Sequence, residues 1–259
     1  MTYPEINPIA LSLGPVSIYW YGIMYLIGFG AGIFLGRIRA RKSHVNWELQ
    51  DIWDLLFFVV LGVVIGGRLG YVVFYNFTYY LDYPIELLFL WSGGMSFHGG
   101  LIGVLFSLYL FARRKNKTFF EVGDFVAPLC PIGFGLGRIG NFINQELWGR
   151  VTDMPWGLVF PLAGPEMRHP SQLYEAGLEG VVLFLILWFY SRQRRPVGAI
   201  SGIFLVGYGS LRFLAEFFRE PDFHIGPILL EWMTMGQLLC LPMVFFGLIF
   251  WIRAIRGAA

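Results

Sequence analysis

Residues 51–75 read DIWDLLFFVVLGVVIGGRLGYVVFY, and this stretch decides the fold class. A helix needs about 20 mostly apolar residues to cross a bilayer core that is about 30 Å thick. The stretch meets that length, and after Asp54 its one charged residue is Arg68. We therefore predict a transmembrane helix whose buried arginine needs an explanation of its own.

The composition of the whole chain agrees with a lipid environment. Of its 259 residues, 56% are hydrophobic, 19% are aromatic and 14% are charged, and the mean hydropathy is +0.62. A soluble domain carries roughly 25% charged residues. These values exclude an ordinary cytosolic enzyme, a disordered chain and a nucleic-acid-binding domain.

Six further apolar segments approach the length of a span. We predict an all-α integral membrane protein with seven transmembrane helices, at about residues 16–36, 51–75, 95–112, 119–141, 173–190, 198–217 and 234–252. Glycines interrupt the third segment near its start, and Pro128 and Pro131 interrupt the fourth. Such breaks are tolerated where protein or a wet cavity satisfies the freed backbone groups.

Basic residues set the expected orientation. Thirteen of the 19 Lys and Arg follow the first, third, fifth and seventh segments, which places them all on one side of a seven-span protein. The positive-inside rule makes that side the cytoplasm. We therefore expect the N-terminus outside and the C-terminus in the cytoplasm.

The longest connection between the predicted spans is residues 142–172. Its composition is rich in Pro, Gly and Trp with mixed charge, which is unlike a flexible linker, and it is too short for an independent domain. We expect residues 1–259 to form a single membrane domain, with 142–172 as a small periplasmic cap.

Several polar residues fall at a similar depth in the predicted spans. At 1.5 Å per residue, Arg68, Arg138 and Arg212 lie roughly 25, 28 and 22 Å from the cytoplasmic ends of their helices. His98 and Tyr21 lie near the periplasmic ends of theirs. One explanation is a structural network in which Glu216, Glu175 and Glu146 partly neutralise the arginines. The other, which we favour for the set, is an anion site, since arginine matches phosphate oxygens and the anion at this depth is a phospholipid head group.

Three motifs carry these residues. Residues 137–149, GRIGNFINQELWG, supply Arg138, Asn141, Glu146 and Gly149 at the end of a span. Residues 208–219 place Tyr208, Arg212, Glu216 and Arg219 on one face of an apolar helix, and such a stripe faces protein or water. His98 precedes Gly99 and Gly100, and a histidine can accept a proton near neutral pH, although a lone one is more often a packing residue.

No cofactor or metal ion is expected. The four histidines, at 44, 98, 169 and 224, have no ligand spacing, and neither Cys130 nor Cys240 is near one. The sequence contains no phosphate-binding loop and no serine nucleophile motif. If the protein is an enzyme, its nucleophile belongs to a substrate.

Taken together, these motifs resemble those of the bacterial phosphatidylglycerol–prolipoprotein diacylglyceryl transferases. The resemblance runs nearly from end to end and is carried by the following stretches: 20–22 (WYG), 66–68 (GGR), 97–100 (FHGG), 137–149, 169–175 (HPSQLYE) and 208–219. It implies a multi-pass enzyme of the bacterial inner membrane with its N-terminus and active site facing the periplasm. Such an enzyme transfers diacylglyceryl from phosphatidylglycerol to the lipobox cysteine thiol of a prolipoprotein and releases glycerol phosphate. The implied partners are therefore this lipid, the lipobox peptide and the bilayer, and no nucleic acid.

The resemblance also implies roles for particular residues. The predicted catalytic residues are His98, Arg138, Arg212 and Tyr21. The predicted substrate-binding residues are Asn141, Glu146, Gly149, Gly99, Tyr208, Glu216 and Arg68. We expect Arg138 and Arg212 to hold the leaving phosphate, and His98 either to accept the thiol proton or to donate a hydrogen bond to lipid. The arginine field lowering the thiol pKa is a second route to the thiolate.

Two alternatives belong to other functional classes. A transporter or scramblase also needs polar groups within its spans. However, the cytoplasmic halves of the odd-numbered segments are almost wholly apolar, which disfavours a path across the membrane. A seven-span receptor or structural protein would not need arginines at the depth of lipid head groups.

Overall fold

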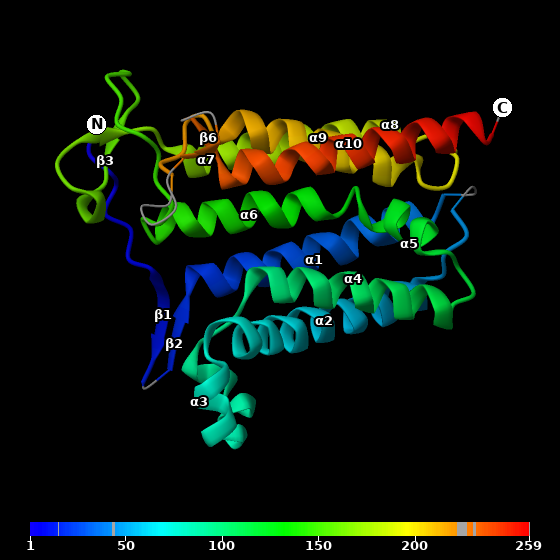
Figure 1. The fold of residues 1–259 in the computed structure, drawn as a ribbon, viewed down its shortest axis with the longest axis horizontal. Helices are drawn as coiled ribbons and strands as arrows, with labels where there is room; N and C mark the ends of the chain where they lie inside the picture. The colour runs from blue at the N-terminus through cyan, green and yellow to red at the C-terminus, as the bar shows by residue number, and fades with distance from the viewer. Residues whose placement is uncertain (15, 43–44, 222–226, 230–231, 259) are drawn as a thin grey trace. The chain divides into compact units, whose positions relative to one another are not determined.

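The computed structural model describes residues 1–14, 16–42, 45–221, 227–229 and 232–258, which are mostly helical (Figure 1). The chain divides into two compact units. The larger unit contains Met1–Gly36 and Asp124–Ala259, and the smaller contains Arg37–Gly123. Each unit is described here by itself.

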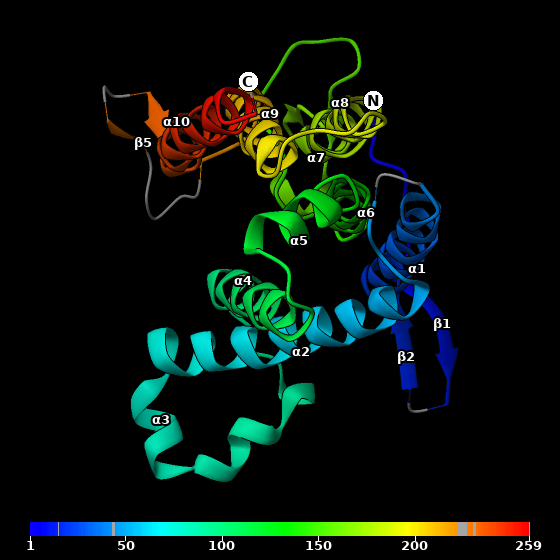
Figure 2. The same cartoon turned by 90° about the vertical axis from the view of Figure 1, so that its right-hand side faces the viewer.

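The smaller unit is built on two long helices, α2 (Leu49–Tyr75) and α4 (Phe97–Arg114), which lie side by side (Figures 1 and 2). Glycines four residues apart form the contact between them. A Cβ atom on Gly70 would lie 2.6 Å from the Cα atom of Gly99, and one on Gly66 would lie 2.7 Å from the Cα atom of Gly103. Small residues at this spacing let helix backbones approach closely in membranes.

A short helical excursion connects α2 with α4. It contains α3 (Phe77–Asp82) and two 3₁₀ turns, η1 (Pro84–Leu88) and η2 (Leu90–Ser92). Ser96 then caps α4, because its hydroxyl accepts a hydrogen bond from the Gly99 amide at 3.2 Å. On the cytoplasmic side of our predicted topology, Lys115 bridges Asp51 and Asp54 at 2.7 Å each.

The larger unit contains the remaining helices. They are α1 (Trp20–Ala40, whose last residues belong to the smaller unit), α5 (Phe119–Val126, shared likewise), α6 (Cys130–Ile143), α7 (Ser171–Glu175), the π-helical segment η4 (Ala176–Val182), α8 (Leu183–Tyr190), α9 (Ala199–Ala215) and α10 (Met235–Arg256). Helices α9 and α10 run side by side (Figures 1 and 2). Leu183 and Leu187 are fully buried between α9 and the preceding segments, where they form a core with Ala127 and Ile200.

The helix predicted at 119–141 is broken. Helices α5 and α6 meet at an angle of 53°, in the segment that contains Pro128 and Pro131. Asp124, close to this bend, accepts hydrogen bonds from the Gly198 amide and from both the amide and hydroxyl of Ser201, each at 2.7 Å. The carboxylate thereby satisfies backbone donors at the start of α9, where a helix has no internal partners for them.

The segment between α6 and α7 packs on the ends of the helices. Its strands β3 (Leu158–Val159) and β4 (Met167–Arg168) form a small hairpin, and β1 (Ile9–Leu13) pairs with β2 (Val16–Tyr19) just before α1. Tyr3 is buried beneath this segment, and its hydroxyl donates to the carbonyl groups of Phe142 and Ile143 at 2.9 and 3.1 Å. The last short strands are β5 (Pro227–Leu229) and β6 (Met233–Thr234), ahead of α10.

The helices have the length and surface of membrane spans. Among the residues that the structure describes, four helices are long and apolar enough to cross a bilayer, namely α1, α2, Ser171–Tyr190 and α10, and the bent pair α5–α6 makes up to five. Phe57, Phe106 and Phe245 are 60–61% exposed, and lipid is the solvent that suits such a surface. The predicted helical membrane protein is confirmed at this level, while seven crossings and their orientation stay predictions.

Candidate functional site

Six charged side chains from three stretches of the larger unit meet at one place. We call them the charge cluster: Arg138 on α6, Glu175 at the end of α7, Glu179 in the π-helical segment, Arg212 on α9, and Glu216 and Arg219 just beyond α9. The cluster contains three guanidinium groups and three carboxyl groups, so its formal charge is balanced when all six are ionised.

Glu175 is the centre of the charge cluster. Its Oε2 atom lies 2.7 Å from Nε of Arg138, and its Oε1 atom lies 2.7 Å from Nη1 of Arg212 and 3.8 Å from Nη1 of Arg219. The Glu175 side chain is 1% exposed. A carboxylate removed from water in this way is stabilised only by close positive partners, so the three arginines and Glu175 depend on one another.

Glu179 reaches the same arginines one helical turn later. Its Oε1 atom accepts a hydrogen bond from Nη1 of Arg212 at 3.4 Å, and its Oε2 atom lies 3.7 Å from Nη2 of Arg138. The spacing of four residues puts Glu175 and Glu179 on one side of their helix. The π-helical backbone begins between them, and such bulges are frequent at functional sites.

The two central arginines differ in how many carboxylates they contact, since Arg212 contacts three and Arg138 contacts two. Arg212 directs Nη1 to Glu175 and Glu179, and directs Nη2 to Glu216 at 2.6 Å. Arg138 uses Nε and Nη2 for its ion pairs, and its Nη1 atom takes no part in them. Its side chain is 19% exposed, against 12% for Arg212. Arg138 is therefore the better placed of the two to meet an incoming anion.

A second polar group follows Arg138 at the end of α6. The carboxylate of Glu146 accepts hydrogen bonds from the side-chain amides of Asn141 at 3.2 Å and Asn144 at 3.1 Å. The residues on either side of Glu146, Gln145 and Leu147, have φ values of 55° and 57°. Residues other than glycine seldom adopt a positive φ, and strained backbone of this kind clusters at functional sites.

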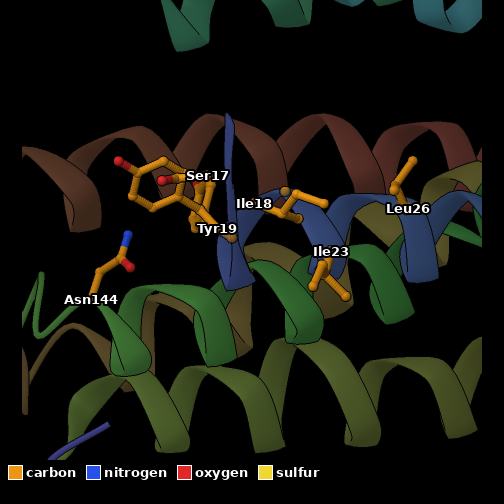
Figure 3. Close-up of a pocket in the computed structure, with 8 residues that line it drawn as sticks. Ser17, Ile18, Tyr19, Ile23, Leu26 and Asn144 are labelled. Atoms are coloured by element: carbon orange, nitrogen blue, oxygen red, sulfur yellow. The ribbon is translucent and has the colours of Figure 1, made fainter. Parts of the chain in front are cut away.

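Tyr21 lies at a hollow beside the end of α6. The hollow has a volume of about 590 Å³ and is lined by Ser17, Ile18, Tyr19, Tyr21, Gly22, Ile23, Leu26 and Asn144. Figure 3 shows Asn144 at one end, with Ile23 and Leu26 further along α1 at the other. The Tyr21 ring rests against Gly140, where a Cβ atom would lie 2.6 Å from it. A hollow with a polar end and an apolar end suits an amphiphile.

Gly149 and Tyr208 pack against other parts of the larger unit. A Cβ atom on Gly149 would lie 2.5 Å from the carbonyl oxygens of both His169 and Phe218, so only glycine fits between them. The Gly149 amide donates to the His169 carbonyl at 2.9 Å. Tyr208 packs with Phe134 at a ring distance of 5.2 Å. Neither residue makes an ion pair with the charge cluster in the part of the chain that the structure describes, and their roles in the reaction stay predictions.

Arg68, in the smaller unit, is 2% exposed and surrounded by backbone. Its Nε donates to the Leu87 carbonyl, its Nη1 donates to those of Gly93 and Gly94, and its Nη2 donates to those of Glu86 and Phe89. These bonds organise the excursion between α2 and α4. This geometry supports a structural role for Arg68, and direct binding of substrate stays a prediction.

The other predicted residues of the smaller unit lie at the start of α4. His98 is exposed, and its ring meets the neighbouring ring of Phe97 edge-on at 5.5 Å. Gly99 is buried in the contact with α2, where its missing side chain makes room for Gly70. The structure thus gives Gly99 a packing role and leaves the His98 ring accessible.

The predicted site residues therefore fall into separate places. The structure unites Arg138, Arg212 and Glu216 in the charge cluster, and joins Asn141 to Glu146 beside it. Sequence reasoning missed Glu179, and it gave Glu175 only a neutralising role. Two glutamates four residues apart in an apolar segment were the available signal. Among the residues that the structure describes, which exclude His44 and His224, no group of His, Cys, Asp and Glu could hold a metal ion.

These features define a helical, multi-pass membrane protein that keeps a dense arginine–glutamate cluster within its helices. Comparison with known proteins assigns the chain further. Residues 8–253 match the prolipoprotein diacylglyceryl transferase family, and the chain belongs to this family of transferases. The resemblance noted from the motifs is thereby confirmed.

The relatives support the same assignment over almost the whole chain. The protein from Pseudoalteromonas atlantica is 57% identical over 98% of this chain and 91% of its own length. Those from Oleidesulfovibrio alaskensis and Legionella pneumophila (strain Lens) are 56% and 52% identical, over 95% and 97% of this chain and 92% and 98% of their own lengths. All three are named phosphatidylglycerol–prolipoprotein diacylglyceryl transferase.

Proposed function

We propose that this transferase moves the diacylglyceryl group of phosphatidylglycerol to the lipobox cysteine of a prolipoprotein. The cysteine sulfur attacks the glycerol carbon that carries the phosphate. A carbon–sulfur bond forms, the carbon–oxygen bond to phosphate breaks, and glycerol phosphate leaves with the bonding electron pair. The thiol proton passes to a base or to the departing phosphate. The product is a thioether, and the reaction as written needs no cofactor.

The observation that carries this proposal is that Arg138 and Arg212 are joined through Glu175 at 2.7 Å each. The leaving phosphate gains negative charge as its bond to carbon breaks. Donors fixed in advance stabilise that charge, by about 3 kcal/mol for one well-placed donor. We propose that Arg138 meets the phosphate directly and that Arg212 joins it by yielding part of its contact with Glu175 and Glu179.

The neighbouring polar residues supply the remaining contacts in this proposal. Glu146, held by Asn141, accepts hydrogen bonds from head-group hydroxyls. The hollow beside Tyr21 takes the glycerol portion at its polar end and the start of an acyl chain at its apolar end. Glu216 and Gly149 keep the charge cluster and the covering segment in place.

His98 is the proposed proton acceptor for the cysteine thiol, because its ring is exposed and imidazole accepts protons near neutral pH. The variant His98→Gln keeps a hydrogen-bond donor but cannot serve as the base. Near-normal transfer by this variant would assign His98 to hydrogen bonding with lipid instead. A large loss would support the role of base.

The proposed topology has seven crossings, with the charge cluster toward the periplasm of a bacterial inner membrane. It is supported by the basic residues in the last turns of α1, α4 and α10 and just after α1, α4 and α8. The cluster residues Arg138 and Arg212 both lie toward the opposite ends of their helices from those basic groups. Labelling single cysteines introduced at Lys117 and at Asp153 from each side of the membrane tests this orientation, since they should react from opposite sides.

The function is tested by incubating the purified protein with phosphatidylglycerol and a lipobox peptide and then weighing the peptide. We expect the mass of the peptide to rise by one diacylglyceryl group. A peptide whose cysteine is replaced by serine is the matched control and should stay unmodified. Movement of lipid between leaflets with no change in peptide mass would instead support a scramblase and overturn the proposal.

A further inference from the structure

The start of α10 contacts the charge cluster through the hydroxyl group of Thr234. Thr234 is the residue before α10, and its Oγ1 donates to Oε1 of Glu216 at 3.0 Å. The same oxygen accepts a hydrogen bond from the Gln237 amide at 3.3 Å, and the Gln237 side chain accepts one from the Thr234 amide at 3.1 Å. Thr234 and Gln237 are 3% and 1% exposed. This reciprocal cap fixes the Thr234 side chain where it meets Glu216.

Glu216, whose carboxyl group is held by Thr234, in turn holds the guanidinium group of Arg212. Its other oxygen, Oε2, lies 2.6 Å from Nη2 of Arg212, whose Nη1 lies 2.7 Å from Glu175. The carboxyl group of Glu216 also rests on Gly236, where a Cβ atom would lie 2.7 Å from Oε1. The glycine therefore leaves space that the Glu216 carboxylate fills. Because carboxylates are favourable in the first turn of a helix, the start of α10 suits this position electrostatically as well.

We propose that Thr234 and Gly236 are positioning residues for the transfer reaction: the hydroxyl of one and the absent side chain of the other hold Glu216 so that it orients the Arg212 guanidinium. This inference rests on the proposed function of Arg212. It assigns a role in catalysis to the start of α10, which contributes no charge of its own to the cluster. The two residues act on one carboxyl group by different means, so their variants test the proposal independently.

Gly236→Ala is the sharper test because it leaves the hydroxyl of Thr234 and the reciprocal cap unchanged. Alanine also favours a helix over glycine, so the substitution should not weaken α10 itself. The added methyl group meets the far end of the flexible Glu216 side chain, which must shift. The shift changes the angle of its hydrogen bond to Arg212 but keeps the two charges close together, so the ion pair is retained and the cost in stability is small. We expect the kcat for diacylglyceryl transfer to fall by about tenfold, as for the loss of one hydrogen bond between charged groups. The KM for the peptide and the thermal unfolding midpoint should stay as in the wild type.

Gly32→Ala is the matched control. Gly32 lies within α1, and, apart from the adjoining backbone of α1, no described residue has an atom within 4 Å of the place that its Cβ atom would take. This variant makes the same chemical change in a helix and should transfer at the wild-type rate. It separates the effect of the displaced carboxylate from any general effect of replacing a helical glycine.

The hydroxyl of Thr234 is tested by Thr234→Val and Thr234→Ser. Valine has nearly the same shape but cannot donate to Glu216, and serine keeps the donor and the cap. We expect kcat per folded enzyme to fall by about tenfold in Thr234→Val and to recover in Thr234→Ser. Thr234→Val also loses the cap and unfolds more easily. Gly236→Ala is therefore the variant that decides whether the positioning role is correct.

The outcomes distinguish this inference from the proposed function. If the wild-type protein adds no diacylglyceryl group to the peptide, the proposed function fails. If the wild type is active and Gly236→Ala and Thr234→Val match it in kcat, the positioning role is wrong while the function stands. A loss of activity in Gly236→Ala that follows its unfolding midpoint would also overturn the inference, because it would show a purely structural effect.

Discussion

The Nε atom of Arg138 lies 2.7 Å from the Oε2 atom of Glu175, on a carboxyl group that is almost wholly removed from solvent. The opposite oxygen of the same carboxyl group contacts Arg212. The arrangement keeps two like charges close together without an outside ligand, and an anion that enters must compete with Glu175 for them. The cluster is therefore both a structural network and a candidate anion site, which are the two explanations that the sequence left open.

Replacing Glu175 by glutamine should destabilise the protein. Glu175→Gln removes one negative charge from a buried group of six, and leaving buried charges without their partner costs about 3–5 kcal/mol. We expect a marked drop in the unfolding midpoint in detergent. Glu166→Gln is the control, since Glu166 is 59% exposed in its pair with Arg168 and should change the midpoint little. Equal midpoints for Glu175→Gln and the wild type would show that the network does not stabilise the fold.

Replacing Arg138 should slow the reaction of the folded enzyme as well as weaken the fold, since Arg138 is also an ion-pair partner of the buried Glu175. Arg138→Ala removes the guanidinium group nearest to an incoming phosphate, and loss of one such donor lowers kcat by about 100-fold to 1,000-fold. Arg138→Lys should recover only part of the rate, because a lysine cannot present two parallel donors. A fluorescent lipobox peptide measures the rates. The control is Arg192→Ala, whose side chain stacks on Phe189 at 4.2 Å just beyond α8. Near-normal turnover in Arg138→Ala would remove Arg138 from the mechanism.

The sequence predicted the elements that depend on local pattern. Each apolar segment contains a helix in the part of the chain that the structure describes, and the break at 119–141 falls where its two prolines indicated it. The ion pair between Arg212 and Glu216 follows from their spacing of four residues, since side chains at this spacing share a helix face. Periodicity is sufficient for such contacts because both partners lie on one helix.

Contacts between distant segments could not be predicted in this way. Arg68 was predicted at the same depth as the other buried arginines, yet its partners are backbone carbonyl groups of residues 86–94. Any residue type supplies such a carbonyl, so the sequence contains no motif that predicts the contact. Gly99 was predicted to bind substrate, whereas the structure packs it against α2. Glu179 joins the charge cluster only because α6 and α9 pack against its helix.

The packing role of Gly99 leads to a prediction about stability. Gly99→Ala places a methyl group against the backbone of Gly70, and such overpacking costs about 1–3 kcal/mol because neither backbone can move freely. Thermal unfolding in detergent measures the loss. Gly32→Ala, with open space around it, should be as stable as the wild type or slightly more stable. An unchanged midpoint in Gly99→Ala would mean that α2 and α4 are less tightly packed than the structure shows.

Arg68→Lys should loosen the excursion between α2 and α4. A lysine keeps the charge but cannot reach carbonyl groups on both sides, so several of them lose a buried partner at a total cost of about 3 kcal/mol. Faster proteolysis within residues 83–94 would show the effect locally. Arg113→Lys is the control, because that side chain is exposed near Tyr109. If Arg68→Lys resists protease as well as wild type but binds phosphatidylglycerol more weakly, the substrate-binding role is supported instead.

His169, in the segment that covers the helix ends, should make stability depend on pH. Burial lowers the pKa of His169 below its usual value near 6.5, and its Nδ1 atom lies 3.1 Å from the Tyr174 hydroxyl. Above pH 6.5 neither the folded nor the unfolded state binds the proton. As the pH falls below 6.5 the unfolded state binds it first, so the free energy of unfolding decreases by at most about 1.4 kcal/mol per pH unit until the folded state also becomes protonated. Unfolding of the wild type and of His169→Gln across pH 5–8 measures this contribution as the difference between their slopes. We expect the wild type to lose stability faster on acidification, and parallel slopes would show that His169 takes up its proton equally well in the folded protein.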